Sequence, residues 1–199
     1  MEYREPVVQE GPSTPLHELW IGAAKTHLNV DWTYEDLLIE EKLRAAISTV
    51  EAVTNRVLLQ TTFRLYLDCF PRRDFITIPK GQLSSVNYLR YYPATSSVVT
   101  WDSSNYEVDS VREPGRLVLA YGKCWPTDVL RSVNGVEIEY IAGWPTADQI
   151  PYALKAAVLL TLGDLYMHRE SVVVTDSGNA VSVTPTVQNL LSPWILWHD

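Results

Sequence analysis

The amino-acid sequence predicts an α+β fold: a helical bundle of two long and two short helices with an inserted antiparallel β unit. Two long segments with the 3.6-residue period of an amphipathic helix lie about a hundred residues apart. Short segments of alternating polar and apolar residues, separated by turn-forming residues, fill the interval between them. With 199 residues, 46% of them apolar, the chain is long enough for one well-buried core or two small ones.

The N-terminal third of the chain is predicted to contain a short and a long helix. Residues 1–13 carry prolines and a glycine without an apolar period, so we expect an extended or mobile arm. A short amphipathic helix is predicted near residues 14–29. A helix of about five turns should follow over residues 33–55, with Thr33 as its N-cap and Asn55, which tolerates a left-handed backbone, as its terminator.

The middle of the chain has the period of β-strands. Apolar and polar side chains alternate over residues 63–67, and Pro71 ends that strand. Several short segments with turns at close spacing indicate an antiparallel β unit. The further predicted strands are residues 75–78, 85–92, 98–101, 106–108, 116–120 and 136–141.

The chain then returns to helix. A second long amphipathic helix is predicted from Pro151 to near Glu170, followed by a flexible loop over residues 171–184 and a short helix that ends before Pro193. After the N-terminal arm, we expect a single domain over residues 14–199. Its parts are the helical residues 14–56 and 150–191, the inserted β unit 57–143 and an apolar C-terminal tail 192–199.

Composition and charge exclude several classes of protein. The net charge of −8 argues against a surface that grips nucleic acid, although an acidic surface can face DNA that must slide past it. No apolar stretch approaches the roughly 20 residues of a membrane span, and the N-terminus lacks the pattern of a secretory signal, so we expect a cytoplasmic location and no membrane contact. Cys69 and Cys124 are predicted to be reduced and buried.

The residues that carry chemistry are scattered. Asp164 and His168, four residues apart on a predicted helix, could belong to a metal site or an acid–base pair, but their spacing is typical of an exposed ion pair. The sequence contains neither a phosphate-binding loop nor a nucleophile elbow. We therefore expect no catalytic residue, no metal site and no cofactor. An enzyme whose catalytic residues converge in space without a motif remains an alternative.

Aromatic side chains indicate protein–protein contact instead. The chain has 7 tryptophans and 11 tyrosines, and such residues are enriched where proteins meet. In the apolar tail, Trp194, Ile195 and Trp197 either fold back on the chain's own core or dock on a partner. We expect Arg169 and Glu170, at the end of the second long helix, to form an intersubunit ion pair or to act only in local helix-end electrostatics.

Several short motifs follow one another along the chain: VEAVTNR at residues 50–56, LYLDCFP at 65–71, ITIPKG at 76–81, SVNY at 85–88, YEV at 106–108, WP at 125–126, VEIEYIAG at 136–143, IP at 150–151, ALKAA at 153–157, LYMHRE at 165–170 and LLSPW at 190–194. Their order resembles that of the phage head–tail connector, or adaptor, family in its long form, over about residues 14–194. Asn55 stands where the family usually has glycine, and the aromatic tail is longer.

The resemblance implies a structural virion protein without catalytic activity. Copies would form a homo-oligomeric, commonly dodecameric, ring beneath the portal protein and link it to a stopper or tail-completion protein, with double-stranded DNA passing through the centre. The protein would be assembled in the host cytoplasm and located in the neck of the virion. A stopper or tail-completion role in the same neck is the nearest alternative, and a carbohydrate-binding module that uses exposed aromatic rings is an alternative of another class.

Overall fold

The computed structural model describes residues 5–168 and 185–197 and has the predicted α+β fold. The chain forms two compact units. The β unit comprises Met1–Pro12 and Leu59–Pro145, and the helical unit comprises Ser13–Leu58 and Thr146–Asp199. In the sequence, the β unit is thus inserted between the two halves of the helical unit. That residues 14–199 form a single domain stays a prediction.

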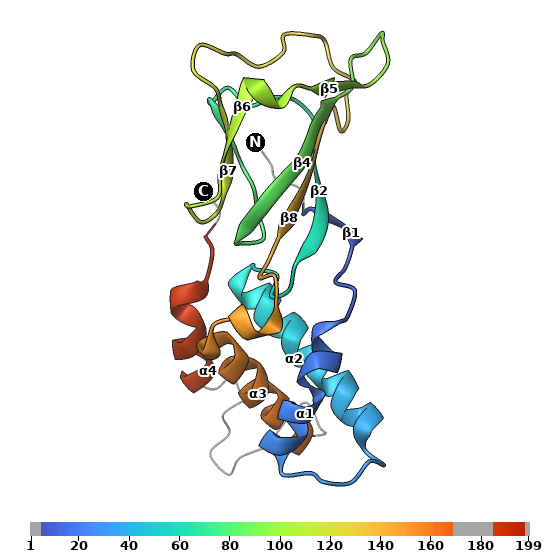
Figure 1. Ribbon diagram of the computed structural model, residues 1–199, viewed down its shortest axis with the longest axis vertical. Helices are drawn as coiled ribbons and strands as arrows, with labels where there is room; N and C mark the ends of the chain where they lie inside the picture. Colours follow the sequence, from blue (N-terminus) through green and yellow to red (C-terminus); the bar gives the residue numbers. More distant parts are fainter. Residues whose placement is uncertain (1–4, 169–184, 198–199) are drawn as a thin grey trace, which may run out of the picture. The chain divides into compact units, whose positions relative to one another are not determined.

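The helical unit contains the two long and two short helices that the sequence predicts (Figure 1). Within this unit α3 contacts each of the other three helices, and its side chains Leu154, Val158 and Leu162 are buried. Among the described residues, no helix is long and apolar enough to cross a membrane. The helices are α1 (Leu16–Leu28), α2 (Asp36–Thr54), α3 (Tyr152–Met167) and α4 (Pro185–Leu191), with single 3-10 turns at Ala147–Gln149 and Ser192–Trp194.

The two ends of α2 differ in how well the sequence predicted them. Asn55 adopts the left-handed conformation (φ 53°) and ends the helix, as predicted. The prediction of Thr33 as N-cap is wrong, because α2 begins at Asp36 and its N-cap residue, Glu35, makes no side-chain cap. The carboxylate of Asp36 instead accepts a hydrogen bond from Lys25 Nζ of α1 at 2.6 Å. A tertiary ion pair therefore lies at the start of this helix.

The β unit contains two antiparallel sheets. The five-stranded sheet has the order β1-β2-β8-β4-β5, and the three-stranded sheet has the order β3-β7-β6 (Figure 1). The strands are β1 (Val7–Glu10), β2 (Thr61–Leu67), β3 (Phe75–Thr77), β4 (Leu83–Tyr91), β5 (Val99–Trp101), β6 (Tyr106–Asp109), β7 (Arg116–Leu119) and β8 (Val136–Ala142).

Strand β1 lies within the N-terminal segment that was expected to be an extended or mobile arm. It pairs with β2 at one edge of the five-stranded sheet. All four of its residues are exposed, so the strand is held by backbone pairing and its side chains carry no alternating pattern. A strand of this kind gives no periodic signal in the sequence.

Alternate side chains of β2 and β8, including Phe63, Leu65, Ile138 and Tyr140, are buried on one face of the five-stranded sheet. An aromatic cluster then connects strands β4, β5 and β6 with two loops, and its stacked, tilted or edge-on rings have neighbouring centroids 5.3–6.3 Å apart. The members of the aromatic cluster are Phe70, Tyr91, Trp101, Tyr106 and Trp125.

The prediction that both cysteines are buried is wrong, since Cys69 and Cys124 are free thiols on the exposed surface. Each cysteine directly precedes a member of the aromatic cluster, Phe70 or Trp125, and these two rings stack at 5.3 Å. The larger side chain of each pair packs in the cluster, and the cysteine lies beside it in an exposed turn.

Candidate interaction surfaces

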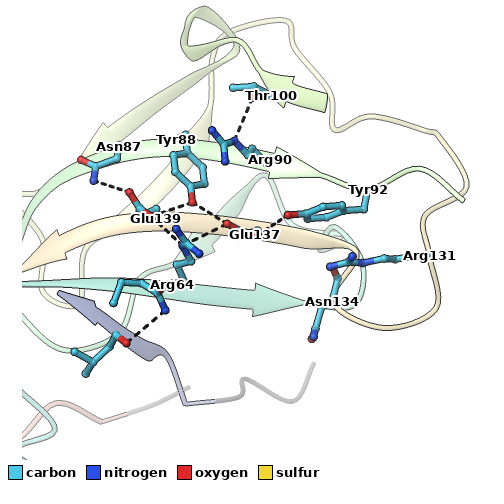
Figure 2. Close-up of polar contacts among 12 residues, drawn as sticks. Arg64, Asn87, Tyr88, Arg90, Tyr92, Thr100, Arg131, Asn134, Glu137 and Glu139 are labelled. Carbon is cyan, nitrogen blue, oxygen red and sulfur yellow. Dashed lines mark hydrogen bonds and ion pairs between the residues drawn. The ribbon is translucent and has the colours of Figure 1, made fainter. Parts of the chain in front are cut away.

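The face of the five-stranded sheet opposite the core carries a network of charged and aromatic side chains, which we call the polar face (Figure 2). Successive side chains of a strand point to opposite faces, so Glu137 and Glu139 of β8 lie on the same side. The register places Arg64 of β2 and Tyr88 of β4 opposite Glu139, and Arg90 of β4 opposite Glu137. The sequence VEIEYIA of β8 thus supplies both the core and the polar face.

Glu137 is the most buried member of the polar face, at 5% exposure. Its Oε1 accepts a hydrogen bond from the hydroxyl of Tyr88 at 2.7 Å, and its Oε2 accepts one from the hydroxyl of Tyr92 at 2.6 Å. The Nε of Arg64 lies 3.5 Å from Oε1. Removing a carboxylate from water costs several kcal/mol unless its oxygens are bonded, and here both oxygens are.

Glu139 lies beside Glu137 and is bound from both neighbouring strands. It accepts hydrogen bonds from Arg64 Nε at 2.9 Å and from Asn87 Nδ2 at 3.1 Å, and at 2.9 Å it shares the single hydroxyl proton of Tyr88 with Glu137. Burial alone would raise the pKa of Glu139, but these three hydrogen bonds together outweigh it and hold the pKa below its ordinary value. The bond to Glu139 in turn raises the pKa of Arg64, so both partners stay charged.

The two tyrosines of the polar face are fixed as proton donors. Burial and the hydrogen bonds to Glu137 and Glu139 raise the pKa of Tyr88, and the hydrogen bond to Glu137 raises that of Tyr92. Arginine guanidinium groups cover both rings: Arg90 Cζ lies 3.8 Å from the centroid of Tyr88, and Arg131 Cζ lies 3.7 Å from that of Tyr92. Because every carboxylate oxygen is already engaged, the network is suited to binding and rigidity rather than to general acid–base catalysis.

The apolar tail folds back on the helical unit through most of its length. Arg56 Nε donates to the carbonyl oxygen of Trp194 at 2.7 Å, and its guanidinium lies 5.6 Å from the Trp194 ring. The backbone N–H of Leu196 donates to the Thr54 carbonyl at 3.0 Å. Ile195 is half-buried, whereas Trp197 is 78% exposed. Of the three predicted partner-binding residues, only Trp197 presents most of its ring to solvent.

A second exposed aromatic surface, which no motif of the sequence indicated, lies in the loop between α1 and α2. The rings of Trp32 and Tyr34 stack at 5.6 Å, and Tyr34 is 78% exposed. Hydrogen bonds to Glu35 Oε2 from Trp32 Nε1 at 3.1 Å and from the Tyr166 hydroxyl at 2.5 Å tie the loop to the end of α3. These bonds hold the aromatic pair in place.

The remaining candidate residues are not brought together. Arg169 and Glu170 lie outside the described residues. His168 Nδ1 is 3.1 Å from the backbone carbonyl of Asp164, so this pair interacts through the helix backbone and not as the side-chain ion pair that the spacing favoured. Within residues 5–168 and 185–197, no group of three or more His, Cys, Asp and Glu side chains could hold a metal ion.

Three comparisons place the fold among known proteins. No protein-family model and no curated protein matches the sequence. Solved structures do match over 97% of both chains: the neck of an empty gene transfer agent particle computed with C6 symmetry (22% identity, TM-score 0.76), the virion of a native gene transfer agent particle (23%, 0.76) and the neck of a native particle computed with C12 symmetry (22%, 0.75). At this level of identity the likeness establishes a shared fold.

Proposed function

We propose that this chain is a structural neck protein of a phage-like particle, a head-to-tail adaptor whose copies form a ring that connects the portal to the stopper or tail. The observation that carries the proposal is the match to gene transfer agent necks over 97% of both chains at TM-scores of 0.75–0.76. The match spans both units, so it does not depend on a common helical or β substructure.

Cyclic symmetry in the matching necks supports a ring of identical copies. In such a ring each copy contacts its neighbours through two different surfaces. The chain offers separate exposed aromatic surfaces that suit such contacts, one at Trp32 and Tyr34 and one at Trp197. The number of copies, which we expect to be twelve, would follow from the symmetry of the assembled neck.

The charge distribution suits a ring through which DNA slides. Of the 24 acidic residues, 12 belong to the helical unit and 12 to the β unit, whereas only 6 of the 16 basic residues belong to the helical unit. The helical unit is therefore the more acidic of the two and repels phosphates. We propose that DNA passes through the centre of the ring without stable contact.

The tail is proposed to anchor the chain to the portal or to a neighbouring copy, with Trp194 and Ile195 positioning the tail and Trp197 entering the partner. Because the Trp194 carbonyl accepts from Arg56 and the Leu196 N–H donates to Thr54, the last residue of α2, truncation after Pro193 would disturb the helical unit as well. The sharper test is Trp197→Ser, with the exposed Tyr121→Ser as its control. We expect Trp197→Ser alone to prevent incorporation into particles, and full incorporation would exclude the anchor.

Arg169 and Glu170 remain proposed as an intersubunit ion pair. Reversing either charge should reduce incorporation into particles, and the combined exchange Arg169→Glu with Glu170→Arg should restore it. Equal incorporation of all three variants would leave the two residues only a local electrostatic role.

The proposed function is tested by affinity purification of the tagged chain from cells that produce particles, with mass spectrometry of the co-purifying proteins. An adaptor should recover a portal protein together with a stopper or tail-completion protein. Recovery of the tail protein without the portal would favour the stopper alternative. Recovery of the chain alone would contradict the neck role and favour a carbohydrate-binding module, whose exposed rings a glycan array would test.

A further inference from the structure

Two arginines of the polar face, unlike Arg64 of the same face, are not ion-paired within the described residues. Arg64, Lys80 and Arg116 of the β unit each lie within 4.0 Å of a carboxylate. Arg90 and Arg131 have no carboxylate of the described chain within that distance and are instead stacked on Tyr88 and Tyr92 (Figure 2). We call these two arginines, with the tyrosines beneath them, the arginine platform.

The platform guanidinium groups are ordered but keep unused donors. Arg90 Nε donates to Thr100 Oγ1 at 3.3 Å, and Arg131 donates to the carbonyl oxygen of Asn134 from Nε at 2.9 Å and from Nη2 at 2.7 Å. A guanidinium group has five N–H donors in one plane. Both arginines are thus held by neutral acceptors while several N–H groups of each remain available to an anion.

The support of the platform extends into the sheet. The Tyr92 hydroxyl donates its proton to Oε2 of the buried Glu137 carboxylate, and the Tyr88 hydroxyl shares its single proton between Glu137 Oε1 and Glu139 Oε2. The buried charge therefore fixes the two rings, and the rings fix the two guanidinium groups. Such a layered arrangement lowers the entropic cost of ordering long side chains when a ligand binds.

We propose that the arginine platform binds carboxylate side chains of an acidic segment of an adjacent protein subunit. Planar guanidinium groups match carboxylates in bidentate geometry. Duplex DNA is disfavoured, because the protein carries a net charge of −8 and phosphate-backbone binding typically uses about 6–10 cationic contacts. The identity of the adjacent subunit rests on the proposed neck function, because in a ring the neighbours are further copies of this chain, each with 24 acidic residues in total. The binding of carboxylates does not rest on that function.

The proposal is tested by nuclear magnetic resonance of the full chain with a decaglutamate peptide as the probe. We expect the peptide to shift the Nε–Hε signals of Arg90 and Arg131. The double variant Arg90→Gln/Arg131→Gln should bind the peptide about tenfold or more weakly than the wild-type protein does. The control is Arg72→Gln/Arg112→Gln, which removes two exposed charges elsewhere in the β unit and should weaken binding by about twofold at most. Unchanged hydrogen exchange in β8 would show that the platform variant is folded.

Three results would overturn the proposal: unshifted Arg90 and Arg131 signals, equal losses of affinity in the two double variants, or tighter binding of a DNA duplex than of the peptide through the same two arginines. The test separates this proposal from the neck function. If particles incorporate the wild-type chain but the arginine platform binds no peptide, the platform proposal alone is refuted. If the chain binds the peptide but never enters particles, the neck role alone is refuted.

Discussion

The hydrogen bond from Tyr92 to the buried carboxylate of Glu137 offers a clean perturbation of the polar face. Tyr92→Phe removes only the hydroxyl, which lies 2.6 Å from Glu137 Oε2, and leaves the ring that supports Arg131. A hydrogen bond to a charged group contributes about 1.5–3 kcal/mol. The variant should lose that much stability, with a fall in melting temperature of about 3–12 °C for a chain of this size.

The loss should be largest in the strand that carries Glu137. Hydrogen–deuterium exchange of peptides covering β8 (Val136–Ala142) should accelerate roughly 10- to 150-fold where exchange reports local or global opening. Tyr121→Phe is the matched control, because Tyr121 is fully exposed, and it should change stability by less than about 0.5 kcal/mol. If Tyr92→Phe were as stable as this control, the network could not be what compensates the burial of Glu137.

The structure supports three further predictions. Gly143→Ala should destabilise the protein by about 1–3 kcal/mol, because Gly143 has a φ of +104° and an added Cβ would lie 2.7 Å from the Leu59 carbonyl oxygen. Gly22→Ala is the control, because Gly22 of α1 faces open space, and it should stabilise the protein slightly. Equal melting temperatures of the two variants would contradict the predicted strain at Gly143. Because the pKa of Glu139 is lowered, urea titrations should show stability being lost as the pH falls below 4.5, the ordinary pKa of that carboxyl. Because the pKa of Tyr88 is raised, they should show stability being lost as the pH rises above 10.0, the ordinary pKa of that hydroxyl. A stability that did not change with pH would refute both pKa shifts. Both thiols should react with a thiol reagent in the native protein, and a protected cysteine would contradict the exposed positions of Cys69 and Cys124.

Much of the fold could be predicted from the sequence because its elements carry strong periodic patterns. The helices α1 to α4 and the strands β2 to β8 all overlap the predicted segments. The failures have local causes. Strand β1 is held by backbone pairing with no buried side chain, and the first residue of α2 is bound by Lys25, a residue of the preceding helix. Neither interaction leaves a periodic signal.

The candidate surfaces were harder to predict because their residues come from distant parts of the chain. Trp197 was identified from composition alone, as an apolar residue near the end of the chain. The polar face was missed, although Glu137 and Glu139 alternate with apolar residues in β8 and so mark a second, polar side of that strand. Their partners Arg64 and Tyr88 could be identified only once the register of the sheet was known, since they lie 75 and 51 residues from Glu139.

The most direct test of the neck role is an electron cryomicroscopy reconstruction of the neck of particles purified from producing cells, with the neck symmetry determined from the data. We expect a ring of copies of this chain between the portal and the stopper or tail, with Trp197 against the portal or a neighbouring copy and the arginine platform against an acidic segment of an adjacent subunit. A neck without this chain, or the chain found at another position in the particle, would contradict the adaptor function.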